Sequence, residues 1–269
     1  MDLTDINARG LVLLGCGKMG SALLQGWLAQ GVSPDAVHVI DPHPSDWLNA
    51  QGVQVNSDLP SSPAIALIAV KPQMMGDALG ALQRLAGETV FLSIAAGTPI
   101  SAFEDVFGKE SRVIRSMPNT PAAIGRGITA IIGNANATPA DLDLAEALLA
   151  AVGQVVRLEN EDQIDAVTGV SGSGPAYVFH LIETLAAAGE AQGLSPELAM
   201  QLAKATVGGA GHLAEQAEES PSQLRINVTS PNGTTQAALE VLMDEERGFP
   251  DLLKRAVKAA TDRSRELRE

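Results

Sequence analysis

The pattern of apolar and polar positions divides the chain into two parts of different character. Up to about residue 160, short apolar runs alternate with amphipathic segments, and no further run of that kind follows. The apolar runs cover residues 11–15, 37–41, 64–70, 89–95, 112–117 and 127–133, and the amphipathic segments lie near 19–30, 72–86 and 138–151. Such alternation predicts a mostly parallel, doubly wound sheet with helices on both faces.

The second part of the chain carries the signals of consecutive helices. Apolar residues recur at helical spacing within residues 174–193. Ser195 and Ser220, each followed by proline, are N-cap signals for two further helices. We therefore expect two domains, an α/β domain over residues 1–160 and an all-helical domain over residues 161–269.

Composition narrows the classes of partner. The formal net charge is −14, from 18 Lys and Arg against 32 Asp and Glu, which argues against a nucleic-acid partner because that needs a clustered basic surface. Cys16 is the single cysteine, so no intrachain disulfide is expected, which fits a reducing compartment. The N-terminus lacks the basic start of a signal peptide, and no apolar stretch reaches membrane-spanning length. We expect a cytoplasmic protein without a membrane partner or a metal site.

A glycine pattern follows the first apolar run. Gly15-x-Gly17-x-x-Gly20 stands between that predicted strand and the start of a predicted helix. The first two glycines allow a tight turn and close approach of a pyrophosphate, the third allows the helix to pack on the strand, and the helix N-terminus supplies oriented N–H groups. The pattern in this context predicts a dinucleotide site, and the alternative is a glycine turn that binds nothing. Within the loop we expect Cys16 to be a small filler rather than a reactive thiol.

Asp41 ends the next predicted strand, 21 residues after Gly20. An acid at this place can accept a hydrogen bond from the ribose 2′-hydroxyl of NAD and repels the 2′-phosphate of NADP. The alternative is that Asp41 only starts the Asp-Pro turn of "DPHP". The sequence leaves both interpretations open.

Three more segments follow predicted strands of the first part. Lys71 stands at the carboxyl end of the run in "AVKPQ", where ligands of open α/β sheets bind, although an exposed structural lysine is the alternative. "SIAAG" (93–97) and "MPNTPAAIG" (117–125) follow later strands in the same way. Their small residues and prolines would form a wall near the nicotinamide, with Asn119 and Thr120 as polar contacts.

Two segments of the helical part offer an anion site. "VSGSGPAY" (170–177) is a Ser/Gly turn before a long helix, and "RINVTSPNGTTQAALEVL" (225–242) places Ser, Pro, Asn, Gly and two Thr before an amphipathic helix. Free backbone N–H groups and hydroxyls at a positive helix end bind carboxylate or phosphate. Ordinary capping by Ser or Thr is the alternative.

Taken in order, these segments resemble those of pyrroline-5-carboxylate reductases. The similarity rests on the glycine pattern with Met19, "AVKP" at 69–72, "MPNTP" at 117–121, "SGSGPAY" at 171–177 and "VTSPNGTT" at 228–235, and the last two are the specific ones. The resemblance implies a Rossmann domain, a helical dimerisation domain, and reduction of 1-pyrroline-5-carboxylate to L-proline. It also implies a homodimer or higher homo-oligomer of interlocked subunits, each active site lying between one subunit's cofactor domain and helices of the dimer.

The same resemblance assigns site residues. Thr235 matches the hydroxyl residue near the imine nitrogen; Ser230, Gly233 and Thr234 match the loop that holds the substrate carboxylate; and Glu218 matches an acid in the helix before that loop. The cofactor-binding residues are Gly15, Gly17, Lys18, Met19, Gly20, Asp41, Asn56, Val70, Lys71, Pro72, Ala96 and Asn119. NADPH is the cofactor by resemblance, and Asp41 leaves NADH open.

Two other classes of protein share the front half of the chain. β-Hydroxyacid dehydrogenases need a catalytic lysine on the long interdomain helix, and residues 174–193 contain none. A nucleotide-sensing binding protein would keep the glycine loop but has no need of "TSPNGTT". Turnover of pyrroline-5-carboxylate with a reduced nicotinamide separates these classes.

Overall fold

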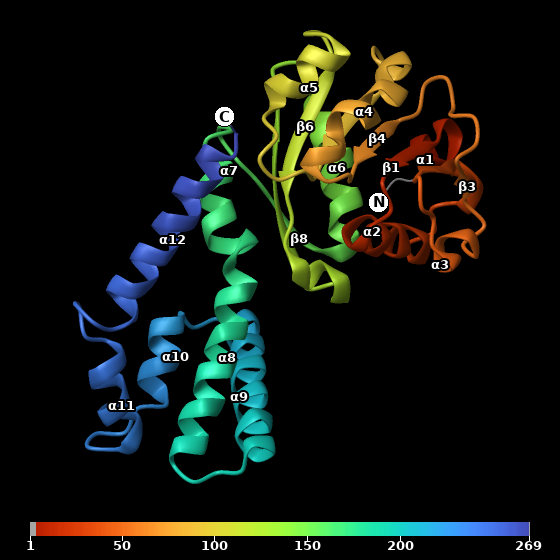
Figure 1. Ribbon diagram of the computed structural model, residues 1–269. Coiled ribbons are helices and arrows are strands. Elements are labelled where there is room, and N and C mark those ends of the chain that lie inside the picture. The colour runs from red at the N-terminus through yellow and green to blue at the C-terminus, as the bar shows by residue number, and fades with distance from the viewer. Residues whose placement is uncertain (1–3, 269) are drawn as a thin grey trace. The chain divides into compact units, whose positions relative to one another are not determined.

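The structure is a computed structural model that describes residues 4–268. Its contacts divide the chain into two compact units (Figure 1). Unit 1 comprises Met1–Gly172 together with Thr261–Glu269, and unit 2 comprises Ser173–Ala260. This division falls after the boundary at residue 160 that the hydrophobic pattern suggests, and it assigns the end of the last helix to unit 1.

Unit 1 is built on an eight-stranded sheet in the order β3-β2-β1-β4-β5-β6-β7-β8. Neighbouring strands are parallel except β6 and β7, so the sheet is mostly parallel, as predicted. Each of the six predicted runs contains a strand. The sequence pattern missed β3, which has only two residues, and β8, none of whose residues is buried. The strands are β1 (Leu11–Leu14), β2 (Val37–Ile40), β3 (Gln54–Val55), β4 (Ile65–Ile68), β5 (Val90–Ser93), β6 (Arg112–Met117), β7 (Gly127–Gly133) and β8 (Gly153–Arg157).

Helices cover both faces of this sheet because the strands are apolar on both sides. Leu11 and Leu13 of β1 pack with Trp27 of α2 on one face, whereas Val12 packs with Phe103 of α5 on the other. The predicted helix over 72–86 is interrupted, with 3-10 turns Pro72–Met74 and Gly80–Leu85 on either side of a short α-helix. The α-helices are α1 (Thr4–Arg9), α2 (Lys18–Ala29), α3 (Asp46–Asn49), α4 (Met75–Leu79), α5 (Ile100–Phe107), α6 (Pro139–Leu149) and α7 (Gln163–Val167).

Unit 2 is helical, as the sequence predicts. Ser195 and Ser220 are the N-caps of their helices, and their side chains accept hydrogen bonds from the N–H groups of Leu198 and Gln223. α8 and α9 form an antiparallel pair (Figure 1). The helices are α8 (Gly174–Ala191), α9 (Pro196–Gln216), α10 (Pro221–Asn227), α11 (Thr234–Leu242) and α12 (Phe249–Glu266), the last of which ends in unit 1.

Unit 2 has almost no apolar core of its own. Its buried apolar side chains are three alanines, Ala186, Ala199 and Ala203, where α8 meets α9. Large apolar side chains face outward instead, among them Phe179 at 58% and Val241 at 72% exposure. Three buried alanines do not stabilise a separate helical unit. The exposed apolar surface of unit 2 therefore requires another surface to cover it. Among residues 4–268, no helix combines the length and the apolar composition that crossing a bilayer requires.

Candidate active site

The glycine loop of unit 1 has the backbone of a pyrophosphate cradle. Gly15 has φ +89, and a Cβ on Gly20 would lie 2.5 Å from the carbonyl oxygen of Gly15, so the turn and the close helix–strand packing each require glycine. A Cβ on Gly17 would meet nothing within 4 Å. Gly17 is also the N-cap of α2, and no side chain makes a capping hydrogen bond there. The loop therefore leaves open space in front of helix N–H groups, which is the arrangement that binds an anion.

Asp41 is tied to this loop by its side chain. Oδ2 accepts the N–H of Cys16 at 2.7 Å and Oδ1 accepts the N–H of His43 at 2.8 Å. The side chain of Asn56 binds the main chain of Asp41. Its Oδ1 accepts the Asp41 N–H at 3.0 Å, and its Nδ2 donates to the Asp41 carbonyl at 2.7 Å. Asn56 itself has φ +50. Asp41 is thus a turn residue that also tethers the glycine loop. A carboxylate has about four acceptor sites, so these two bonds leave it able to accept a ribose hydroxyl.

The surroundings of Cys16 disfavour ionisation of its thiol. Burial, and then the nearby charge of Asp41, raise the pKa of Cys16 from 9.0 to about 11. The thiol is consequently protonated at neutral pH, which fits the interpretation of Cys16 as a loop filler.

The other predicted cofactor residues of unit 1 differ in the exposure of their side chains. Lys18, Lys71 and Ala96 are exposed, Met19 is half-buried against the core, and Val70 lies against Gly15. The side chain of Pro72 lies outside the described part of the structure.

Asn119 is committed to protein contacts. Its Oδ1 accepts the N–H of Ile128 at 2.9 Å and its Nδ2 donates to the carbonyl of Ser171 at 3.1 Å. The side chain therefore joins the loop after β6 to the π-helical turn Thr168–Gly172. The Oδ1 atom and one N–H group of the Asn119 amide therefore hold these two loops together.

The predicted substrate segment of unit 2 forms a tight turn before α11. The N–H of Gly233 donates to the carbonyl of Ser230 at 3.0 Å, and Asn232 has φ +56, which suits a turn with Pro at its second and Asn at its third position. Gly233 is the N-cap of α11 without a capping side chain, and Gln236 instead accepts the N–H of Asn232 at 2.8 Å. The first N–H groups of α11 therefore stay available for an anion.

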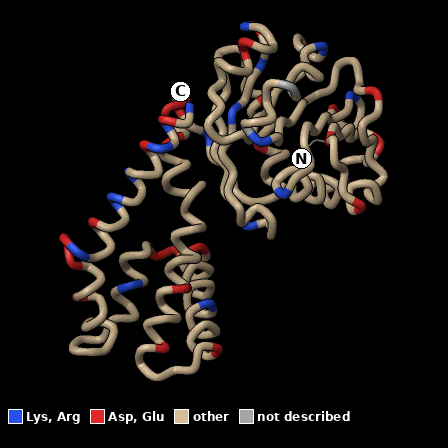
Figure 2. The backbone as a smooth tube through the Cα atoms, in the orientation of Figure 1, with Lys and Arg blue, Asp and Glu red and all other residues tan. Residues whose placement is uncertain are grey.

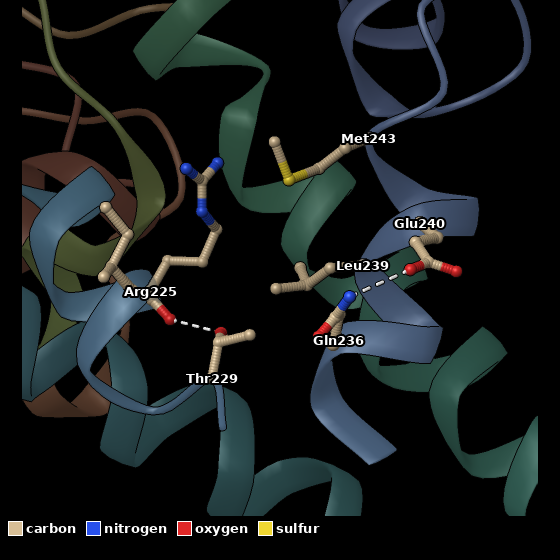
Figure 3. A pocket seen from close by; sticks show the side chains of 7 residues that line it. Arg225, Thr229, Gln236, Leu239, Glu240 and Met243 are labelled. Atoms are coloured by element: carbon tan, nitrogen blue, oxygen red, sulfur yellow. Dashed lines mark hydrogen bonds between the residues drawn. The ribbon is translucent and has the colours of Figure 1, made fainter. Parts of the chain in front are cut away.

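A cavity of about 410 Å³ lies beside this turn, between α10 and α11 (Figure 3). The side chains of Arg225, Leu239 and Met243 line it, as do Thr229, which directly precedes the turn, and Gln236 in the first turn of α11. None of the predicted substrate residues lines it. The sequence reasoning did not single out Arg225, which adds a half-buried positive charge next to the turn.

One placement differs from expectation. Glu218 was expected in the helix before the turn, but α9 ends at Gln216 and Glu218 lies exposed in the bend that leads to Ser220. Ala217 already has an extended backbone, so the helix does not continue to Glu218. Glu218 does not line the cavity beside the turn.

The fold and these two features define a class of protein. A mostly parallel sheet whose first strand leads into an open glycine loop, combined with a helical unit, is the construction of a nicotinamide-dependent oxidoreductase. Lys and Arg occur in both units, and along α12 they are interspersed with Asp and Glu (Figure 2).

Comparisons with known proteins identify the family. Residues 161–267 match the family model "Pyrroline-5-carboxylate reductase dimerisation", and residues 11–97 match "NADP oxidoreductase coenzyme F420-dependent". The pyrroline-5-carboxylate reductase of Pseudomonas aeruginosa is 40% identical over 266 residues, covering 96% of this chain and 97% of that protein. That of Glycine max is 37% identical over 278 residues, covering 99% and 100%.

Solved structures agree with the sequence comparison. A pyrroline-5-carboxylate reductase from Coxiella burnetii has a TM-score of 0.91 at 34% identity, covering 97% of this chain and 99% of that one. The Plasmodium falciparum enzyme with NADP bound has a TM-score of 0.83 at 28% identity, covering 98% and 99%. The chain belongs to the pyrroline-5-carboxylate reductase family.

Proposed function

We propose that the chain reduces the C=N bond of 1-pyrroline-5-carboxylate to L-proline with NADPH or NADH. The observation that carries the proposal is the match to named reductases from end to end, 40% identical over 96% of the chain. The geometry of the glycine loop and of the turn before α11 supports the proposal, because the two would supply the cofactor and substrate binding that this reaction requires.

The residues of unit 1 fit a dinucleotide. The open space at Gly17 and the uncapped first turn of α2 suit the pyrophosphate. When bound, the reduced nicotinamide supplies the hydride. Asp41 favours NADH because its carboxylate repels a 2′-phosphate, whereas the family resemblance favours NADPH, so we propose use of both.

The turn before α11 would hold the substrate carboxylate. Ser230 and Thr234 are exposed and offer hydroxyls, and the free N–H groups at the start of α11 lie on the positive end of the helix. Fixing the carboxylate would set the imine carbon about 3–3.5 Å from the hydride donor, the separation of a near-attack geometry.

Thr235 is the residue we assign to the imine nitrogen. Its hydroxyl makes no hydrogen bond to any residue among 4–268 and so is free to orient a substrate. A hydroxyl is a weak acid at neutral pH, so we assign Thr235 to orientation or proton relay and expect the imine to react in its protonated form.

The working assembly is a homo-oligomer, and we propose that it is at least a dimer. The scarcity of buried apolar side chains in unit 2 supports a second copy as the missing cover, and residues 161–267 match a dimerisation family model. A location in the cytoplasm stays a prediction.

The test compares substrate classes with purified protein. Oxidation of NADPH or NADH should depend on added 1-pyrroline-5-carboxylate. α8 contains neither Lys nor Arg, so a 3-hydroxyacid with the oxidised cofactor should give no reaction. Activity with the hydroxyacid alone would point to the dehydrogenase class, and cofactor binding without turnover would point to a sensing protein.

A further inference from the structure

The C-terminal end of the chain is bound to α7 through a fully buried carboxylate. Asp165 of α7 is 0% exposed, and its Oδ1 accepts a hydrogen bond from the hydroxyl of Ser264 at 2.8 Å. Its Oδ2 lies 2.5 Å from Nη2 of Arg268. That oxygen takes no hydrogen bond within the described residues, so the charge of Arg268 is what compensates it. Arg268 also reaches Asp162 at 3.4 Å.

The same C-terminal turn lies against the loop that follows β5. A Cβ on Gly97 would be 3.3 Å from the carbonyl oxygen of Leu267 and 3.6 Å from its Cβ, so the two main chains are in contact there. Gly97 has φ +77, a conformation that favours glycine. The loop 94–99 therefore rests on the end of the chain.

The other end of that loop is held from the same segment. Glu161 Oε1 accepts the N–H of Ile100, the first residue of α5, at 2.9 Å. The same oxygen pairs at 2.6 Å with Nη1 of Arg115, whose side chain is 1% exposed. Residues 161 and 165 thus brace the loop twice, directly at Ile100 and through the C-terminal turn at Gly97.

The loop lies at the edge of the sheet where ligands of this fold bind. It follows the carboxyl end of β5, and β5 pairs with β4, the strand before Lys71. The glycine loop follows β1, which pairs with β4 on its other side. The glycine loop after β1 would meet the pyrophosphate. In the strand order β2-β1-β4-β5, β5 lies on the opposite side of β1 from β2, so the loop after β5 would meet the nicotinamide end of the cofactor.

We propose that Ser264 and Arg268 are positioning residues for the nicotinamide: by holding Asp165 they seat the C-terminal turn on Gly97 and fix the loop 94–99. The inference rests on the proposed function. Loosening the loop leaves the adenosine side of the cofactor bound as before and misplaces the hydride donor. Displacement of reacting groups by about 1 Å from a change far from the chemistry can cost on the order of 100-fold in rate.

The experiment compares Arg268→Ala with Arg263→Ala. Arg263 is the matched control, since it lies on α12 just before the C-terminal turn, and within residues 4–268 it pairs with the exposed Glu266 at 2.7 Å. We expect Arg268→Ala to lower kcat about tenfold or more, with a larger primary isotope effect from cofactor deuterated at the transferred position, because hydride transfer becomes more rate-limiting. Inhibition by ADP-ribose, which lacks the nicotinamide, should stay unchanged. Arg263→Ala should match the wild type in all three.

Folding defects are separated by two further variants. Arg268→Lys keeps the positive charge and should restore most of the rate. Arg268→Ala with Asp165→Asn removes the uncompensated buried charge, so it should regain thermal stability while kcat stays low. If the double variant regains the full rate, or if Arg268→Ala leaves the rate and the isotope effect at wild-type values, the proposal is overturned.

Titration of cofactor fluorescence keeps the two hypotheses apart, because it needs no turnover. A wild-type protein that binds NADPH or NADH but does not reduce the imine contradicts the proposed function alone. The inference about Arg268 then stands if the variant weakens binding of the reduced cofactor and spares ADP-ribose. It fails if both ligands bind as in the wild type.

Discussion

Thr235→Val separates a catalytic hydroxyl from a structural one. The hydroxyl makes no hydrogen bond within residues 4–268, the N-cap of α11 is Gly233, and no side chain caps that helix. Valine has nearly the shape and helix propensity of threonine, so the substitution should change the free energy of unfolding by less than about 0.5 kcal/mol. A threonine that capped the helix would instead cost about 0.5–2 kcal/mol on removal.

The kinetic loss should be much larger than the loss of stability. A hydrogen bond to the imine nitrogen contributes roughly 0.5–1.5 kcal/mol net, which corresponds to a drop in rate of about 2- to 12-fold. Its contribution is larger in a dry site, so we expect a drop of about tenfold or more. Because the bond matters mainly in the transition state, kcat and kcat/KM should fall together. Steady-state kinetics with 1-pyrroline-5-carboxylate, beside a thermal unfolding curve, measures both quantities.

Ser230→Ala is the matched comparison in the same turn. Ser230 is assigned to the substrate carboxylate, which it holds in the ground state and the transition state alike, so KM should rise with little change in kcat. Wild-type kinetics in a folded Thr235→Val protein would refute the role of this hydroxyl.

Three further predictions concern the cofactor loop and the assembly. Asp41→Ser should shift the ratio of kcat/KM values toward NADPH, since it removes a carboxylate from beside the 2′-phosphate. An unchanged ratio would mean that Asp41 is only a turn residue that holds the N–H groups of Cys16 and His43. Cys16 should react with iodoacetamide about 100-fold more slowly at pH 7 than a thiol of pKa 9.0, because its pKa is about 11. The rate of labelling should rise steadily as the pH approaches that pKa. Rapid labelling of the folded protein at pH 7 would contradict this prediction. Light scattering at assay concentration should find a dimer or larger assembly, because unit 2 buries only small apolar side chains, and a fully active monomer would rule it out.

Most of the sheet could be predicted because a buried strand has a continuous apolar run in the sequence. Val37–Ile40 and Ile65–Ile68 lie where such runs stand. β8, at Gly153–Arg157, was missed because none of its residues is buried and it contains the polar Gln154 and the charged Arg157. The helix expected over 72–86 contains Gly76 and Gly80, which weaken a helix, and it is interrupted at Gly80.

The site was predicted less completely than the fold. Gly15 and Gly20 could be found because each has a backbone reason to be glycine, and Gly17 because it leaves open space in the loop. The link from Asp165 to Ser264 joins residues 99 positions apart, and nothing in the local pattern of the C-terminal segment distinguishes Ser264 from a solvated helix position. The role of Glu161 at the start of α5 is hidden for the same reason, because contacts between distant segments leave no periodic signal.

The central claim is hydride transfer to the imine, and isotope transfer tests it most directly. The protein would be incubated with 1-pyrroline-5-carboxylate and reduced cofactor deuterated at the transferred position, and the proline analysed by mass spectrometry and NMR. We predict one deuterium per proline, on the ring carbon that adjoins the nitrogen and does not carry the carboxylate, with one cofactor oxidised for each proline formed. Proline without deuterium, or cofactor oxidation without proline, would contradict the claim.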